Sequence, residues 1–365
     1  MKKIDIQPYD ERIYTEIKSR WDSIAKPLDS LGRFEDIVAK IGAVQGTADP
    51  SVARRAVVMM CADNGVVCQG ISQSGQDVTR EVAAWMGQGT SSVCRMASAA
   101  GVETLPVDIG INMEGSPEGV LNMKVRRGTR DFLTSHAMTR AEASAAIKHG
   151  TEIIRMCKEE GCTVIAAGEM GIGNTTTSAA LISALLGIPA QEVTGRGAGL
   201  SDEGLDRKTE VVRTAVSNLM DEWKETAGST DRSSSEYAFH ALCCVGGLDI
   251  AGMAGMFIGG AVYHVPVVID GIVSAAAALV AERICPGCSD AMIASHVGRE
   301  PGMRQIMKEL GLVPVIDADM ALGEGTGAVM LFPLLDMAMA LYKDGLRFNE
   351  TEVGQYVRLG SDADD

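Results

Sequence analysis

Short apolar runs of strand length alternate with longer segments of helical periodicity along most of the chain. The short runs, which predict strands, cover residues 56–62, 104–109, 163–167, 265–269 and 313–316. The longer segments, which predict helices, lie at 13–24, 34–44, 79–100, 139–160, 175–187, 201–223, 236–262, 271–283, 301–310 and 326–343. This alternation is typical of an α/β protein, and we expect a doubly wound, mostly parallel sheet flanked by helices.

The two ends of the chain depart from this pattern. Residues 1–50 and about 326–365 predict a smaller helical part, whereas residues 51–325 predict an α/β Rossmann-like catalytic domain. Asp29 or Ser30 is expected to cap the helix that begins near residue 34. The last residues, 360–365, predict a frayed acidic tail.

Most of the predicted strands run into an acid or a glycine at their carboxyl ends. These residues are Asp63, Asp108, Gly168-Glu169, Asp270-Gly271 and Asp317. Open α/β sheets bind ligands in the crevice outside these ends. The sequence therefore predicts a site assembled from several separated turns.

Residues 168–177 predict a strand end, a glycine turn and a helix that opens with hydroxyl side chains. Such a helix N-terminus favours an anion, and the glycines let backbone N–H groups approach it. No Gly-Lys-Ser/Thr follows, so this is not a P-loop, and a monophosphate is favoured over a triphosphate. Glu169 lies inside the expected turn, which indicates a role at a less charged part of the ligand. A purely structural strand-to-helix turn is the alternative.

A second glycine-flanked acid, Glu324, stands in Gly323-Glu324-Gly325-Thr326-Gly327, before another predicted helix. A carboxylate held there can take a proton from a heterocyclic N–H or from a hydroxyl. The alternative is an ordinary first-turn glutamate favoured by the helix dipole.

A third glycine turn, at residues 195–200, is accompanied by Arg196 and Lys208. Cations beside glycine backbone suit a phosphate. The alternative is an ordinary helix start capped by Ser201.

Composition narrows the class of partner. A net charge of −15 argues against nucleic acid and against anionic membrane surfaces. Residues 1–5 lack the apolar core of a signal peptide, and the apolar stretch at 251–268 is interrupted by glycines, a histidine and a proline. An odd number of cysteines, nine, without framework spacing fits reduced thiols, so we expect a cytoplasmic protein.

Metal and hydrolase chemistry find little support in the sequence. Cys285 and Cys288 form a single C-x-x-C pair with no second pair, and the neighbours Cys243 and Cys244 point in different directions on a helix. Only His296 stands in a suggestive context; the other histidines are expected on helix surfaces or in the core. We therefore expect no metal and no cofactor, and no nucleophilic serine turn.

Several strings together resemble one family, the nicotinate-nucleotide–dimethylbenzimidazole phosphoribosyltransferases. They run in order from about residue 20 to 343, at 26–33, 168–177, 195–197, 246–251, 270–271 and 322–327. The resemblance implies transfer of the 5-phosphoribosyl group from nicotinate mononucleotide to a lower-ligand base, giving an α-ribotide for cobamide (vitamin B12-type) biosynthesis. It also implies small-molecule substrates and a dimer, either a homodimer or a heterodimer with a paralogue.

The resemblance implies a role for particular residues. Glu324 matches the general base, and Glu169 matches a second acid near the ribose. The nucleotide-binding turns map to Gly171, Gly173, Asn174, Thr175, Gly197, Lys208, Gly271, Ile272 and Gly298. The base pocket maps to Ser74, Gln76 and Met170.

The chain departs from the family pattern in places. Asn64 stands where the family usually has histidine, and Ser74-Gly75-Gln76 replaces an aromatic and a proline beside the base pocket. Gly298 and Met303 replace a serine and a histidine. These changes leave the acceptor open among benzimidazoles, adenine and phenols. They also leave open a non-catalytic partner subunit, and a phosphate-ester hydrolase stays as a third alternative.

Overall fold

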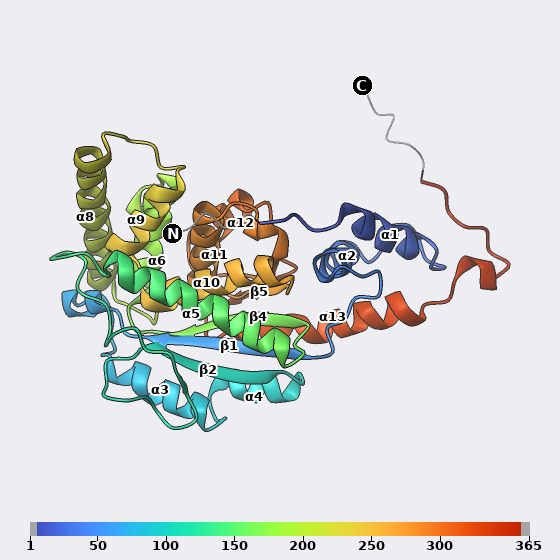
Figure 1. Cartoon of the computed structure of the whole chain (residues 1–365), viewed down its shortest axis with the longest axis horizontal. Helices are drawn as coiled ribbons and strands as arrows, with labels where there is room; N and C mark the ends of the chain where they lie inside the picture. The colour runs from blue at the N-terminus through green and yellow to red at the C-terminus, as the bar shows by residue number, and fades with distance from the viewer. Residues whose placement is uncertain (1–5, 359–365) are drawn as a thin grey trace.

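The computed structural model describes residues 6–358 (Figure 1). The expectations for residues 1–5 and for the acidic tail at 360–365 lie outside these residues. The centre is a six-stranded sheet in the order β3-β2-β1-β4-β5-β6, with every neighbouring pair parallel. Its strands are β1 (Arg55–Ala62), β2 (Glu103–Gly110), β3 (Leu121–Asn122), β4 (Val164–Met170), β5 (Val267–Ile269) and β6 (Met292–Ala294). The predicted doubly wound α/β fold is confirmed.

The strand order places the direction change of the chain between β1 and β4. The chain first moves outward from β1 to β3 and then returns, adding β4 on the other side of β1. In open α/β sheets this switch point opens a crevice at the carboxyl ends of the strands, where ligands bind. The predicted site residues that follow β4 therefore lie at the favoured place.

Helices cover both faces of the sheet (Figure 1). They are α1 (Glu11–Asp22), α2 (Arg33–Gln45), α3 (Asp77–Gly87), α4 (Ser92–Ala99), α5 (Arg140–Glu159), α6 (Asn174–Leu186), α7 (Ala190–Val193), α8 (Asp202–Ala227), α9 (Ser235–Val245), α10 (Leu248–Tyr263), α11 (Ile272–Ile284), α12 (Met303–Glu309) and α13 (Thr326–Asp344). Short 3-10 turns lie at Gly65–Gln69, Cys288–Ala291 and Phe348–Glu350.

Successive side chains of β1 point to opposite faces of the sheet, so this strand contributes to two hydrophobic cores. Val58 and Met60 point into the larger core, which α5, α6 and α8 to α12 build on one face. Val57 and Met59 point into a second core, built by α1 to α4 and α13 on the other face. Side chains of the terminal helices thus share one core with the sheet.

Two predicted helices are each divided in the structure. The helix expected at 79–100 is two helices, α3 and α4, because Gly89 adopts a left-handed backbone with φ 71° and Ser91 accepts from the N–H of Cys94 to cap α4. The helix expected at 236–262 breaks at Gly246-Gly247 into α9 and α10. Both predictions were wrong in the same way, since glycines inside an apolar stretch ended the helix.

The strand predicted at 313–316 was also misplaced. Its place is taken by β8 (Ile316–Met320), which pairs with β7 (His296–Gly298) in a separate two-stranded sheet. Asp317 therefore lies within β8 and not at the edge of the main sheet. The cap prediction at Asp29 or Ser30 was wrong as well, because Gly32 precedes α2 and the Glu35 carboxylate accepts from the N–H of Leu31.

The stretch at 251–268 is a buried helix, α10, followed by β5, as predicted. Among the described residues, α13 is the one helix whose length and apolarity would allow it to cross a membrane. Its window is 56% buried inside the protein, as is common for a core helix.

Candidate functional site

A cavity of about 210 Å³ opens at the carboxyl edge of the sheet. Its walls include nine of the predicted site residues: Glu169, Met170, Gly171, Asn174, Thr175, Gly197, Gly271, Ile272 and Gly298. A smaller neighbouring cavity of about 80 Å³ shares several of these and adds Gly173 and Lys208. The structure thus brings together residues from β4, β7, three helix N-termini and the turn at 195–200.

Lys208 and Thr175 form the cationic end of this site. Lys208 is only 1% exposed, and its Nζ donates to Thr175 Oγ1 at 2.8 Å. Thr175 lies in the first turn of α6, after Gly173, which has a left-handed backbone with φ 94°. Burial lowers the pKa of Lys208 to about 8, although the charge of Glu300 opposes the shift. A buried lysine beside a helix N-terminus is a site suited to an anion such as a phosphate.

Glu300 fixes the glycine turn that closes this end. Its Oε1 accepts from the N–H of Gly197 at 3.2 Å, and its Oε2 fills the space that a Cβ on Gly195 would need. Glu300 also lines the larger cavity. Glu300 was not predicted as a site residue from the sequence, although it stands only four residues after His296, whose sequence context was noted.

Two acids meet at Asn174 on the other side of the site. Asn174 Nδ2 donates to Glu169 Oε2 and, at 3.2 Å, to Oδ2 of the buried Asp249. Glu169 belongs to the last residues of β4 and not to the turn after it, which corrects the expectation from the sequence. Burial, assisted by the charge of Asp249, raises the pKa of Glu169 to about 8, and burial raises that of Asp249 to about 6. Near neutral pH, Glu169 is therefore largely protonated and able to donate a hydrogen bond.

Asp270, at the end of β5, holds the second glycine turn in place. Its carboxylate accepts from the N–H groups of Gly325, Gly327 and Ala328 at 3.1, 2.8 and 3.0 Å. Negative charge at the N-terminus of α13 is favourable to the helix dipole. His296 Nδ1 lies 4.0 Å from Asp270 Oδ1, and its ring occupies the space that a Cβ on Gly327 would need. Asp270 therefore acts as an anchor of the site.

Glu324 stands in a strained turn. Gly323, Glu324 and Gly325 all have positive φ, at 84°, 61° and 96°. For a non-glycine residue this conformation is unfavourable and is retained mainly where function requires it. The carboxylate Oε2 accepts from the N–H of Val93 at 3.1 Å, at the N-terminus of α4. Gly323 lines the larger cavity, whereas the Glu324 side chain is directed toward α4.

Ser74 and Gln76 lie outside the walls of these two cavities. Gln76 Nε2 donates to the backbone oxygen of Asn64 at 3.3 Å, and Asn112 Nδ2 donates to Gln76 Oε1 at 2.9 Å. The Asn64 side chain is buried against the Gly171 turn, so Gln76 is connected to that turn through Asn64. Met170 is the one predicted base-pocket residue that the larger cavity includes.

Comparison with known proteins gives a consistent result. A family model described as phosphoribosyltransferase matches residues 6–353. The nicotinate-nucleotide–dimethylbenzimidazole phosphoribosyltransferase of Clostridium acetobutylicum is 39% identical over 97% of each chain. The chain belongs to this phosphoribosyltransferase family. The enzyme of the same name from Acetivibrio thermocellus is 40% identical over 93% of each chain.

Solved structures agree with this assignment. CobT from Thermus thermophilus superposes with a TM-score of 0.86 at 38% identity, covering 94% of this chain and all of the other. The resemblance seen in the sequence is therefore confirmed. The site of this family member has a buried lysine, Lys208, at one end and a carboxyl group, that of Glu169, in the wall of the larger cavity.

Proposed function

We propose that this chain transfers the 5-phosphoribosyl group of nicotinate mononucleotide to an aromatic lower-ligand base, giving an α-ribotide for cobamide biosynthesis. The observation that carries the proposal is a pair of neighbouring cavities with the buried cation Lys208 in the smaller one and the half-buried acid Glu169 in the wall of the larger one, joined through Asn174 to the buried Asp249 behind it. A nucleotide monophosphate has a matching anion at one end and a polar sugar at the other.

The residues suggest how the transfer proceeds. The phosphate binds at Lys208, Thr175 and the N-terminus of α6, which places the ribose beside Glu169. The bond between C1′ and the nicotinate nitrogen breaks, and its electron pair leaves with nicotinate. Positive charge that develops on the sugar is stabilised by the negative charge of Asp249, which, with a pKa of about 6, is ionised near neutral pH whereas Glu169 is largely protonated. A lone pair of the acceptor forms the new bond to C1′ from the opposite face.

Glu324 is the group we assign to proton removal. A benzimidazole N–H or a phenol O–H must lose its proton as the new bond forms, and a fixed carboxylate can accept it. The hydrogen bond from Val93 N–H and the dipole of α4 keep the Glu324 carboxylate oriented. Glu169, in its protonated form, is assigned to holding the ribose, together with Asn174.

We assign the acceptor pocket to Ser74, Gln76 and Met170, with the remaining predicted nucleotide contacts at Gly171, Gly173, Gly197, Gly271, Ile272 and Gly298. The acceptor is a benzimidazole or a phenol. The test is incubation of the purified chain with nicotinate mononucleotide and a panel of benzimidazoles, adenine and phenols, with products identified by mass. Ribotide formation supports the proposal, and the acceptor that reacts fastest shows whether this chain uses a benzimidazole or a phenol.

A second candidate function is a non-catalytic partner subunit of a heterodimeric enzyme. Asn64, a buried residue that stands where the family usually has histidine, favours it. Robust turnover by the chain alone excludes this second candidate.

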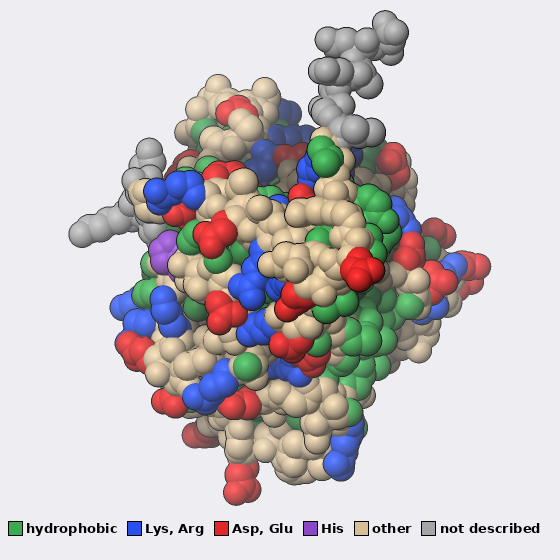
Figure 2. Space-filling view, turned by 90° about the vertical axis from the view of Figure 1, so that its right-hand side faces the viewer, with side chains coloured by type: hydrophobic (Ala, Val, Ile, Leu, Met, Phe, Trp, Pro, Cys, Tyr) green, Lys and Arg blue, Asp and Glu red, His purple; other side chains and the backbone are tan. Residues whose placement is uncertain are grey.

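We also propose that the protein is cytoplasmic and that residues 1–50 and 326–365 form a smaller helical part of each chain. We further propose that the chain forms a dimer. Hydrophobic side chains gather on one face of the molecule (Figure 2). The exposed large hydrophobics include Met330 and Met337, seven residues apart on one side of α13, together with Trp85 and Leu322. An exposed apolar helix face of this kind favours association with a second subunit.

A further inference from the structure

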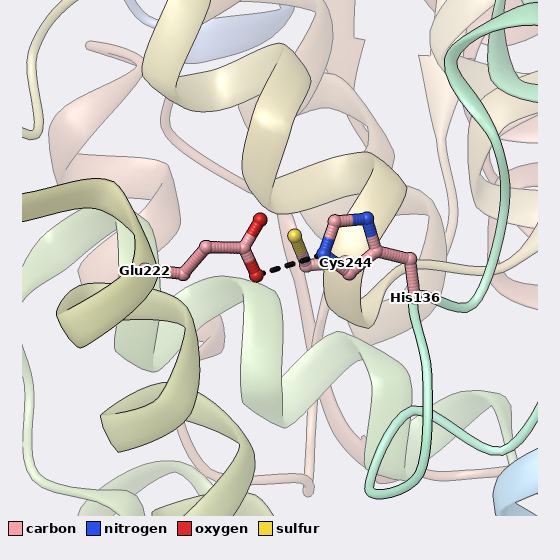
Figure 3. A group of neighbouring side chains, drawn as sticks. All are labelled: His136, Glu222 and Cys244. Atoms are coloured by element: carbon pink, nitrogen blue, oxygen red, sulfur yellow. Dashed lines mark hydrogen bonds and ion pairs between the residues drawn. The ribbon is translucent and has the colours of Figure 1, made fainter. Parts of the chain in front are cut away.

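Four side chains with metal-binding atoms meet far from the cavity, between α8, α9 and the loop that precedes α5. His136 comes from that loop, Glu222 from the last turns of α8, and His240 and Cys244 from one face of α9. Figure 3 shows His136, Glu222 and Cys244 directed toward one another. Glu222 lies fourteen residues after Lys208 on the same helix, which is about 21 Å away at the rise of an α-helix.

The distances within the cluster suit a shared ion. One ligand atom from each of His136, Glu222 and Cys244 lies within 4.8 Å of the others. His136 Nε2 is 2.8 Å from Glu222 Oε2, and His240 Nε2 is 3.5 Å from Cys244 Sγ and 3.7 Å from Glu222 Oε1. Ligand atoms around a tetrahedral zinc ion are separated by about 3.3–3.8 Å, which the distances from His240 to Cys244 and Glu222 match, whereas the His136 and Glu222 side chains must rotate apart for an ion to fit between them.

We propose that His136, Glu222, His240 and Cys244 bind one transition-metal ion of the zinc class. Two imidazoles, a thiolate and a carboxylate form the borderline-soft donor set that selects zinc over magnesium or calcium. The thiolate and the carboxylate balance the two positive charges of the ion, and the thiol proton of Cys244 is released to solvent when the ion binds.

The surroundings support a site of this kind. Cys244 is buried and the His240 side chain is 12% exposed, whereas the His136 side chain is 46% exposed and leaves a path for the ion. Arg140, whose charge opposes a cation near His240, is paired with Glu236 at 2.8 Å. The net charge of −15 favours cations in general.

The role we assign to the ion is structural. The loop that carries His136 also contacts the carboxyl edge of the sheet, where the Thr129 N–H donates to the backbone oxygen of Asp63 at 2.9 Å and the Thr129 hydroxyl accepts from the N–H of Gly65 at 2.9 Å. An ion that joins this loop to α8 and α9 would restrict the motion of the loop, and so stabilise the hydrogen bonds that Thr129 makes with the backbone of Asp63 and Gly65. The sequence did not predict the site, because its ligands come from three separated segments, and only His240 and Cys244 show a local spacing, His-x-x-x-Cys.

The test uses the full chain, freed of metal with a chelator and then titrated with Co²⁺. We expect one ion per chain, a thiolate-to-cobalt charge-transfer band in the near ultraviolet, displacement by Zn²⁺ and a higher melting temperature with either ion. Cys244→Ser should remove the band. His136→Gln, at an exposed loop position that tolerates change, should weaken binding by about tenfold or more.

Cys243→Ser is the matched control, because Cys243 is also buried on α9 but lies outside the cluster. It should keep the band and the affinity. The proposal is overturned if the unchanged chain gives no charge-transfer band, if Cys243→Ser has the same effect as Cys244→Ser, or if His136→Gln binds Co²⁺ as tightly as the unchanged chain.

Discussion

The backbone of Gly168 lies directly against the backbone of Glu324. A Cβ atom at position 168 would be 2.4 Å from the carbonyl oxygen of Glu324 and 3.2 Å from the Cα of Gly325. The last residues of β4 therefore determine where the strained turn that carries Glu324 lies. These two segments are 156 residues apart in the sequence (168 to 324), and their backbones can lie this close because Gly168 has no side chain.

Gly168→Ala should consequently displace Glu324. We expect a loss of about 1–3 kcal/mol in the free energy of unfolding, as for other overpacked sites, and a fall in kcat of about a hundredfold from misplacement of the base. Denaturant unfolding and initial rates measure the two effects. Gly354→Ala, at a position with open space around it, is the control and should change neither. An unchanged kcat in Gly168→Ala would contradict the proposed coupling.

Lys208→Met should weaken nucleotide binding, because it removes the buried cation and its hydrogen bond to Thr175. We expect KM for nicotinate mononucleotide to rise about tenfold to a hundredfold. Since the pKa of Lys208 is lowered to about 8, the lysine of the unchanged enzyme loses its charge above that pH, and its KM should rise there. The variant should lack this pH dependence. Lys148→Met, at an exposed position of α5, is the control.

Glu169→Gln should stabilise the protein in a pH-dependent way. The folded-state pKa of Glu169, about 8, lies above its ordinary value of 4.5, so the stability associated with its proton is present below pH 4.5 and is lost as the pH rises through 8. The variant should match the unchanged protein near pH 4.5 and melt about 2 °C or more higher above pH 8. A thermal unfolding series over this range measures the difference. Equal melting temperatures at every pH would contradict the raised pKa.

Met337→Glu should disrupt the dimer. A charge placed on the exposed apolar face of α13 would be buried without a partner in the interface, which weakens association by about a hundredfold or more. Light scattering across a range of protein concentrations reports the mass. Asn218→Glu, on the exposed side of α8, is the control and should stay dimeric. A Met337→Glu dimer of unchanged affinity would place the interface elsewhere.

The parts of the fold that were predicted correctly are those with a local signal. β1 was placed within one residue because a strand buried on both faces has an uninterrupted apolar run. The turn after β4 was recognised because its glycines and hydroxyls are contiguous. The α9–α10 break was missed because the apolar character of the surrounding residues masked Gly246 and Gly247. β7 and β8 are too short or too exposed to give a periodic pattern.

The parts of the site that were missed depend on contacts between distant segments. Asp249 reaches Asn174 across 75 residues, and Glu300 reaches Gly197 across 103. No spacing in the sequence indicates either contact, because the folding of α10 and of the segment after β7 creates them. Ser74 and Gln76 were assigned only from the resemblance, and their roles stay predictions.

The most direct test of the account is the initial rate of Glu324→Gln with nicotinate mononucleotide and the acceptor that the unchanged enzyme prefers. Glutamine keeps the size of the side chain and an oxygen for the Val93 N–H, but it cannot take up the proton. We predict a fall in kcat of about 10²–10⁴-fold with little change in KM for the nucleotide, while Glu352→Gln, at an exposed position, keeps full activity. Full turnover by Glu324→Gln would contradict the assignment of Glu324 as the general base.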